Sequence, residues 1–105
     1  MRRIKHKFHA KPTTRDGIKF DSQLEAKYYD QMVLAQRAGD LLFFLRQVPI
    51  HLPGGVKLVV DFVEFWDDGN VVFTDVKGME TESFKAKRRM VESLYPLTIN
   101  IVKKV

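Results

Sequence analysis

Two neighbouring apolar segments each carry an acidic residue where a buried strand would ordinarily carry none. The first, residues 58–63, reads Leu-Val-Val-Asp-Phe-Val, and the second, residues 71–78, reads Val-Val-Phe-Thr-Asp-Val-Lys-Gly. Because side chains alternate between the two faces of a strand, Asp61 shares its face with apolar residues, and Asp75 shares its face with Lys77. A carboxylate on a core-facing row must be paired, hydrogen-bonded or bound to a metal to stay ionised. We therefore expect both acids to have specific partners.

The turn between these segments, residues 67–70, decides how the two acids face each other. A two-residue loop would place Asp61 opposite Val76. A three-residue loop, with Gly69 in the left-handed conformation, would place Asp61 opposite Asp75. Only the second register keeps the apolar side chains on matching faces, so we predict that the Cβ atoms of the two acids lie about 4.5–5.5 Å apart. The other pairs of this register are Trp66 with Asn70, Phe65 with Val71, and Val63 with Phe73.

This arrangement predicts a metal site. Two like charges so placed repel each other, and a divalent cation between them would turn that repulsion into binding. Ligands that are all oxygen favour Mg²⁺ or Mn²⁺ over zinc. The plainer alternative, an ion pair between Asp75 and the diagonally adjacent Lys77, is worth about 0–1 kcal/mol if exposed. It leaves Asp61 unexplained, so the three residues together favour a functional site.

Composition limits the kinds of protein this can be. The chain has 105 residues, enough for one domain with a single hydrophobic core. It has no cysteine, which excludes disulfides, thiolate zinc sites and a cysteine nucleophile. The histidines at positions 6, 9 and 51 lack ligand spacing, so we expect them to be exposed. The longest wholly apolar run, residues 41–45, is too short to cross a bilayer, and we expect a soluble, cytoplasmic protein without membrane partners.

Basic residues gather at the amino terminus. Residues 1–19 hold seven basic residues against one acid, a net charge of +6, so the rest of the chain sums to −1 within the total of +5. We divide the chain into a basic arm, residues 1–15, and a domain, residues 16–105. Such an arm suits the backbone of a nucleic acid, whereas the alternative is a solvated terminus with no partner. The arm residues that we expect to contact DNA are Arg2, Arg3, Lys5, Lys7 and Lys11.

The order of the expected elements predicts an α/β fold. Apolar residues at helical spacing indicate two helices, and the last strand would return beside the central hairpin, in parallel, through the second helix. The result is a mixed sheet flanked by helices, with an αβββαβ order. We expect a loop or short hairpin at 13–19, helices at 20–38 and 81–94, a first strand at 41–52, the hairpin of the two acid-bearing strands, and a last strand at 97–102.

Three stretches of the chain resemble motifs of the PD-(D/E)XK nuclease superfamily. They are residues 16–25, Asp-Gly-Ile-Lys-Phe-Asp-Ser-Gln-Leu-Glu; residues 60–62, Val-Asp-Phe; and residues 75–78, Asp-Val-Lys-Gly. Within the superfamily they are similar to a small phage and prophage family found among replication and recombination genes, which includes Holliday-junction-resolvase-like enzymes. The similarity runs from residue 16 to residue 102.

The resemblance implies a fold, an activity and a location. It implies a restriction-endonuclease-like core and a structure-selective endodeoxyribonuclease that uses Mg²⁺ or Mn²⁺ to hydrolyse phosphodiester bonds in branched DNA. Such an enzyme, encoded by a phage or prophage, would act in the cytoplasm of the bacterial host. A flap or nicking nuclease is an alternative within the class. Outside it, the alternative is a noncatalytic DNA-binding or assembly module on the same frame.

Carried over residue by residue, the resemblance names four catalytic positions. Asp61 and Asp75 would be metal ligands, Glu25 the helix-borne acid that completes the metal site, and Lys77 the catalytic lysine. The proline of the superfamily's name is replaced here by Val60, and this leaves the adjacent acid in place.

Glu25 also has a purely structural interpretation. Residues 22–25, Ser-Gln-Leu-Glu, form a capping box, in which Ser22 caps a helix and Glu25 reaches back to the amide of the capping residue. From the residues alone this interpretation is favoured, and the resemblance reverses the preference.

Two further surfaces have expected partners. Lys85 and Arg88 on the second helix would stand beside the acids and bind DNA phosphates, although acids before bases along a helix also suit its dipole. Residues 42–45, Leu-Phe-Phe-Leu, are apolar on both faces of an outer strand. They permit a homodimer, which would place two sites on two strands of branched DNA.

Overall fold

A long antiparallel hairpin is the largest element of the structure. The computed structural model describes residues 12–105 of the chain. Strand β3 (Leu41–Leu52) runs into β4 (Val56–Trp66) through a short 3₁₀ turn, η2 (Pro53–Gly55), and both glycines of that turn have positive φ. Glycine is suited to this backbone because it has no Cβ to clash in the left-handed region.

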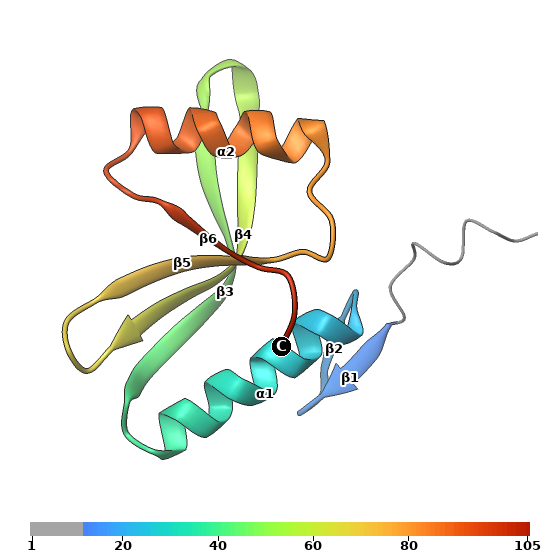
Figure 1. Ribbon diagram of the computed structural model, residues 1–105, viewed down its shortest axis with the longest axis vertical. Coiled ribbons are helices and arrows are strands. Elements are labelled where there is room, and N and C mark those ends of the chain that lie inside the picture. The colour runs from blue at the N-terminus through green and yellow to red at the C-terminus, as the bar shows by residue number, and fades with distance from the viewer. Residues whose placement is uncertain (1–11) are drawn as a thin grey trace, which may run out of the picture.

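Two more strands complete a four-stranded sheet in the order β3-β4-β5-β6. Strand β5 (Val71–Val76) is antiparallel to β4, and β6 (Ile99–Val102) is parallel to β5. The parallel pair is joined by helix α2 (Glu82–Leu94), as Figure 1 shows. The predicted mixed sheet flanked by helices is therefore confirmed.

The register between β4 and β5 is the one predicted from the three-residue loop. Gly69 has φ of 90°, in the left-handed region, and the backbone N–H of Trp66 donates to the carbonyl of Asn70 at 3.0 Å. The sheet ladder ends one pair before Asp61 and Asp75, so these acids stand at the point where the two strands stop pairing through their backbones. The paired residues are Phe62–Thr74, Val63–Phe73, Glu64–Val72 and Phe65–Val71.

The amino-terminal part of the described chain forms a small hairpin and a helix. Strands β1 (Thr13–Arg15) and β2 (Ile18–Phe20) pair antiparallel, and α1 (Gln23–Arg37) follows. The helix predicted from residue 20 starts three residues later, because Ser22 is its N-cap and Phe20 belongs to β2.

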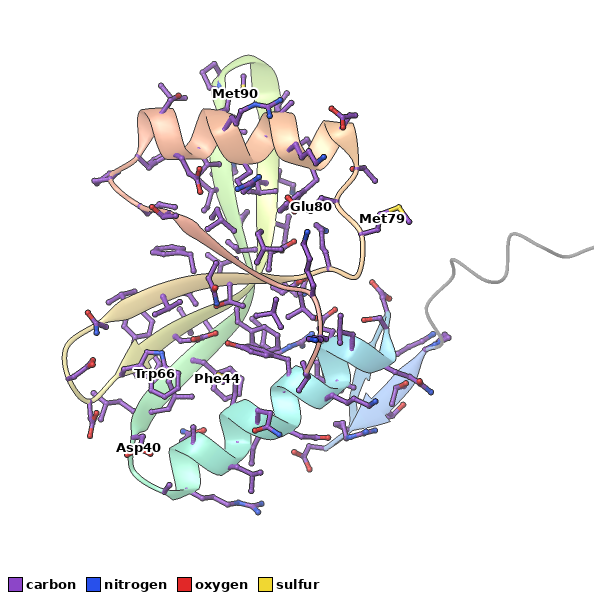
Figure 2. All side chains as sticks on the ribbon, viewed as in Figure 1. Asp40, Phe44, Trp66, Met79, Glu80 and Met90 are labelled. Atoms are coloured by element: carbon purple, nitrogen blue, oxygen red, sulfur yellow. The ribbon has the colours of Figure 1, made fainter. Side chains whose placement is uncertain are left out.

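The two helices cover different parts of the hairpin, and this divides the core in two (Figure 1). One cluster lies between α2 and the η2 end of the hairpin and includes Val60. The other lies between α1 and the opposite end and includes Phe62; Phe44 and Trp66 pack against it (Figure 2). Val60 and Phe62 are each 0% exposed, so Asp61 occupies the boundary between the two clusters.

A buried acid beside the α1 cluster has a hydrogen bond to each of its two carboxylate oxygens. Glu64, 1% exposed, accepts hydrogen bonds from the hydroxyl of Tyr28 at 2.5 Å and from the indole N–H of Trp66 at 3.1 Å. Burial, followed by the contact with Glu64, raises the pKa of Tyr28. The bond from Tyr28 links α1 to β4 and so helps to fix the helix on the sheet, whereas the bond from Trp66 lies within β4. Within residues 12–105, no helix is long and apolar enough to cross a membrane.

The division of the core predicts unequal costs for truncating two phenylalanines. Phe62 is fully buried and its ring contacts Tyr28 edge-on, with centroids 5.1 Å apart, whereas Phe43 is 45% exposed. We expect Phe62→Ala to lower the free energy of unfolding by about 3–5 kcal/mol in urea titrations, because it leaves a cavity. The control Phe43→Ala should cost much less, and equal costs would contradict this description of the core.

Candidate active site

Asp61 and Asp75 lie together at the boundary between the two core clusters. The backbone N–H of Val76 donates to Oδ2 of Asp61 at 2.8 Å, and the backbone N–H of Asp61 donates to Oδ1 of Asp75 at 3.3 Å. Each carboxylate therefore accepts a backbone amide beyond the end of the ladder between β4 and β5. The side chains take over the hydrogen bonding that regular strand pairing no longer provides.

Asp75 retains one oxygen with no hydrogen bond. Its side chain is 1% exposed, and Oδ2 is buried and forms an ion pair with the ammonium of Lys77 at 3.1 Å. That ammonium also lies 4.6 Å from the ring centroid of Phe84 on α2. This buried oxygen is therefore compensated by an ion pair with Lys77 and not by a directed hydrogen bond.

Glu25 brings a third carboxylate to the same place from the first turn of α1. Ser22 accepts the backbone N–H of Glu25 at 3.0 Å, as in the capping interpretation, but the carboxylate of Glu25 points into the site. Its Oε2 accepts from Nη2 of Arg46 at 3.1 Å and from Nε2 of Gln47 at 3.1 Å. Glu25 is 7% exposed, so this carboxylate is buried beside its partners.

Arg46 and Gln47, both on β3, are site residues that the sequence analysis missed. Gln47 links two acids, because its Nε2 also donates to Oδ1 of Asp61 at 3.2 Å. Arg46 lies over the ring of Phe20, with the guanidinium carbon 4.3 Å from the centroid. The signal that could have found them is the polar pair itself, which interrupts an otherwise largely apolar strand.

The electrostatics of the site are unfavourable to charge on Asp61. Burial is the largest cause and repulsion from Asp75 the second, and together they raise the pKa of Asp61 from 3.8 to about 7. The hydrogen bonds from Val76 and Gln47 act in the opposite direction and only partly offset this. Without a cation, this carboxylate therefore binds a proton far more readily than a free aspartate.

The donor set fits a hard divalent cation in chemical type. Glu25, Asp61 and Asp75 offer only oxygen, and the buried Oδ2 of Asp75 lacks a hydrogen bond. Within residues 12–105, no three acidic or histidine side chains are arranged so that they could hold a metal ion between them. The acids are instead held by donors between them: Arg46 and Gln47 on Glu25, and Lys77 on Asp75.

The expected DNA contacts divide into two groups. Those of the arm, residues 2–11, lie outside the described residues. On α2, Lys85 lies 3.5 Å from Glu82, and Arg88 lies 3.3 Å from Glu80 in the loop before the helix (Figure 2). Arg88 therefore has an internal partner already, whereas Lys85 faces an acid whose side chain is 86% exposed.

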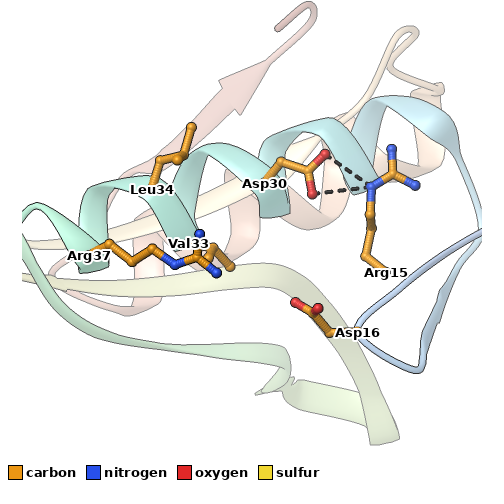
Figure 3. A pocket seen from close by; sticks show the side chains of 6 residues that line it. All are labelled: Arg15, Asp16, Asp30, Val33, Leu34 and Arg37. Atoms are coloured by element: carbon orange, nitrogen blue, oxygen red, sulfur yellow. Dashed lines mark hydrogen bonds and ion pairs between the residues drawn. The ribbon is translucent and has the colours of Figure 1, made fainter.

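A separate pocket of about 260 Å³ lies against α1 and the β1–β2 turn, and none of the three acids lines it (Figure 3). Arg15 donates to both carboxylate oxygens of Asp30, at 3.2 and 3.0 Å, and the hydroxyl of Tyr29 donates to Asp16 at 3.0 Å. These bonds attach the small hairpin to α1. They account for Arg15, Asp16 and Asp30, and the full lining of the pocket is Arg15, Asp16, Asp30, Val33, Leu34 and Arg37.

Comparison with known proteins places the chain in a family. It belongs to the DUF1064 family, described as proteins of unknown function, whose model matches residues 5–104. Neither the curated proteins nor the solved structures gave a match.

The raised pKa of Asp61 predicts how stability varies with pH when divalent metals are removed with a chelator. As pH rises from about 4 to 7, the unfolded chain releases this proton while the folded protein retains it, so the folded state loses stability across that window. Asp61→Asn removes the effect. We expect its free energy of unfolding to rise relative to wild type between pH 4 and 8, by about 1.4 kcal/mol for each unit by which the pKa is raised.

The exposed Asp67, in the loop between β4 and β5, provides the matched control as Asp67→Asn. Urea titrations of the three proteins at pH 4, 6 and 8 measure the effect. A difference between Asp61→Asn and wild type that stays constant over this range would contradict the electrostatic description of the site.

Proposed function

We propose that this protein is a metal-dependent endodeoxyribonuclease of the PD-(D/E)XK type that acts on branched DNA. The observation that carries the proposal is the connected constellation from three elements: Glu25 on α1, Asp61 on β4, and Asp75 with Lys77 at the end of β5. Gln47 joins the helix-borne acid to Asp61. The resemblance of the motifs named these four residues, and the fold gives them contacts with one another or through Gln47.

The architecture supports the same proposal. The resemblance implies a restriction-endonuclease-like core, and the mixed sheet with two flanking helices is compatible with it. The site lies where β4 and β5 cease to pair through their backbones, and its carboxylates belong to neither core cluster. A small hairpin, β1–β2, precedes this core.

Each residue of the site has a role that its surroundings suit. Glu25, Asp61 and Asp75 would hold Mg²⁺ or Mn²⁺, an ion that, when bound, lowers the pKa of a water and neutralises phosphate charge. Lys77 Nζ, 3.1 Å from Asp75 and 32% exposed along its side chain, can donate hydrogen bonds to the attacking water or to a phosphate oxygen. Its positive charge would stabilise the negative charge that develops on the phosphate during attack.

The choice of DNA rests on charge and resemblance. The arm has a net charge of +6, whereas the rest of the chain sums to −1, and a polyanion is the partner such a segment attracts. Branched DNA, with a flap or a nick as alternatives, follows from the resemblance. A homodimer would suit a junction, and the exposed side chains of Leu42, Phe43 and Leu45 on the edge strand β3 support one, at 58%, 45% and 48% exposed.

One observation favours a noncatalytic function instead. Glu25 and Asp75 each have a cationic partner within the protein, Arg46 and Lys77, so their charges are partly compensated without any metal. A DNA-binding module that kept the nuclease frame could use these pairs only for stability. The substitutions Asp75→Asn and Lys77→Ala distinguish this noncatalytic function from the nuclease function.

The direct test is cleavage of labelled linear, flap and four-way DNA in Mg²⁺ by wild type, Asp75→Asn and Lys77→Ala. We expect wild type to cut branched DNA, and each substitution to lower the rate by at least about 100-fold, as the loss of a preorganised charge-stabilising group does. Asp67→Asn serves as the control with full activity. Cutting that survives both site substitutions would refute the assigned site, and binding without cutting in Mg²⁺ or Mn²⁺ would favour the noncatalytic module.

The role of the arm is tested separately by deleting residues 1–11. If its basic side chains bind phosphates, the slope of log K against log salt should become shallower by about 0.9 for each phosphate that the shortened chain no longer neutralises. Fluorescence anisotropy with a labelled DNA duplex over a range of salt concentrations measures both slopes. An unchanged slope would show that the arm does not bind the backbone.

A further inference from the structure

Two consecutive residues of β3 reach the same carboxylate oxygen. Arg46 Nη2 and Gln47 Nε2 both donate to Oε2 of Glu25, each at 3.1 Å. In a regular strand, neighbouring side chains point to opposite faces of the sheet, so they cannot both reach one atom by pleating alone. The backbone must depart from strand geometry at this point.

The departure is confined to Gln47. Its φ is 54°, in the left-handed region, and Asp16 is the other non-glycine residue with positive φ among residues 12–105. On either side the ladder with β4 is regular, with Arg46 paired to Phe62 and Val48 paired to Val60. A left-handed glutamine is strained because its Cβ crowds the backbone, and such strain persists where the surroundings require it.

The strained residue places a neutral donor between two acids. Nε2 of Gln47 donates to Glu25 at 3.1 Å and to Asp61 Oδ1 at 3.2 Å, which uses both amide hydrogens. Unlike Arg46, the carboxamide adds no positive charge, so it can hold the two carboxylates near each other while leaving their negative charge available to a cation. The contact fixes α1 relative to β4 at the site itself.

We propose that Gln47 is a positioning residue that orients Glu25 and Asp61 for a divalent cation, at the expense of a strained backbone. The inference rests on the proposed function for the role of the cation. Groups that orient metal-binding side chains from behind typically change metal affinity by 10–100-fold when removed.

The test compares Gln47→Gly and Gln47→Ala by calorimetric titration with Mn²⁺ alone, without DNA, and by thermal melting. Both variants should bind Mn²⁺ about 10–100-fold more weakly than wild type, because both lack the carboxamide. Gln47→Gly should melt above Gln47→Ala, because glycine relieves the left-handed strain. Gln47→Gly should therefore lose Mn²⁺ affinity as much as Gln47→Ala does while melting at a higher temperature. If the glutamine were merely structural, the loss of Mn²⁺ affinity would instead follow the loss of thermal stability.

The control is Gln36→Ala, which removes another glutamine carboxamide. Gln36 lies on α1 away from the acids, and its carboxamide donates to the carbonyl of Leu42 at 3.3 Å. It should leave Mn²⁺ affinity unchanged. Unchanged affinity in Gln47→Gly, with a wild type that binds Mn²⁺, would overturn this inference. So would weaker binding in Gln47→Ala alone, because the backbone and not the carboxamide would then be responsible.

The outcomes also distinguish this inference from the proposed function. If wild type binds Mn²⁺ and Gln47→Gly weakens binding, but no DNA is cut, the positioning role stands and the nuclease function falls. If wild type cuts DNA and Gln47→Gly binds Mn²⁺ normally, the nuclease function stands alone. A wild type that binds no Mn²⁺ overturns the positioning role together with the metal-dependent mechanism.

Discussion

The mutual hydrogen bonding of Asp61 with the end of β5 is the interaction on which the rest of the site depends. Val76 donates its amide to Asp61, and Asp61 donates its own amide to Asp75. These bonds lie between two core clusters, each closed by its own helix, so Asp75 is buried and Asp61 half-buried without either being packed inside a cluster. The fold thus places a polar region between two apolar clusters, and the other hydrogen-bond donors of the site lie around it.

This polar region makes the fold less stable than a regular sheet with apolar residues at the same positions would be. Asp61 is charged only with difficulty, because burial and Asp75 both raise its pKa. Gln47 adopts a backbone conformation that favours glycine, and Asp75 keeps a buried oxygen without a hydrogen bond. Backbone strain and buried acids of this kind concentrate at functional sites, and they support the function proposed for this member of the DUF1064 family.

The sequence predicts some of this arrangement and not the rest, for identifiable reasons. The register of β4 and β5 followed from local information, because Gly69 selects the loop and alternation fixes the faces. Glu25 entered the site through resemblance, since the contact between α1 and β3 is a matter of tertiary packing. Gln47 could not be placed, because alternation puts it on the face opposite Arg46 and a left-handed non-glycine residue has no reliable sequence signal.

The most direct test of the central claim is a crystal structure of the protein soaked in Mn²⁺, measured at a wavelength where manganese scatters anomalously. The account predicts an anomalous peak within bonding distance of the carboxylates of Asp61 and Asp75, with Glu25 oriented towards it by Gln47. A peak elsewhere, or acids that keep their internal partners at saturating Mn²⁺, would contradict it.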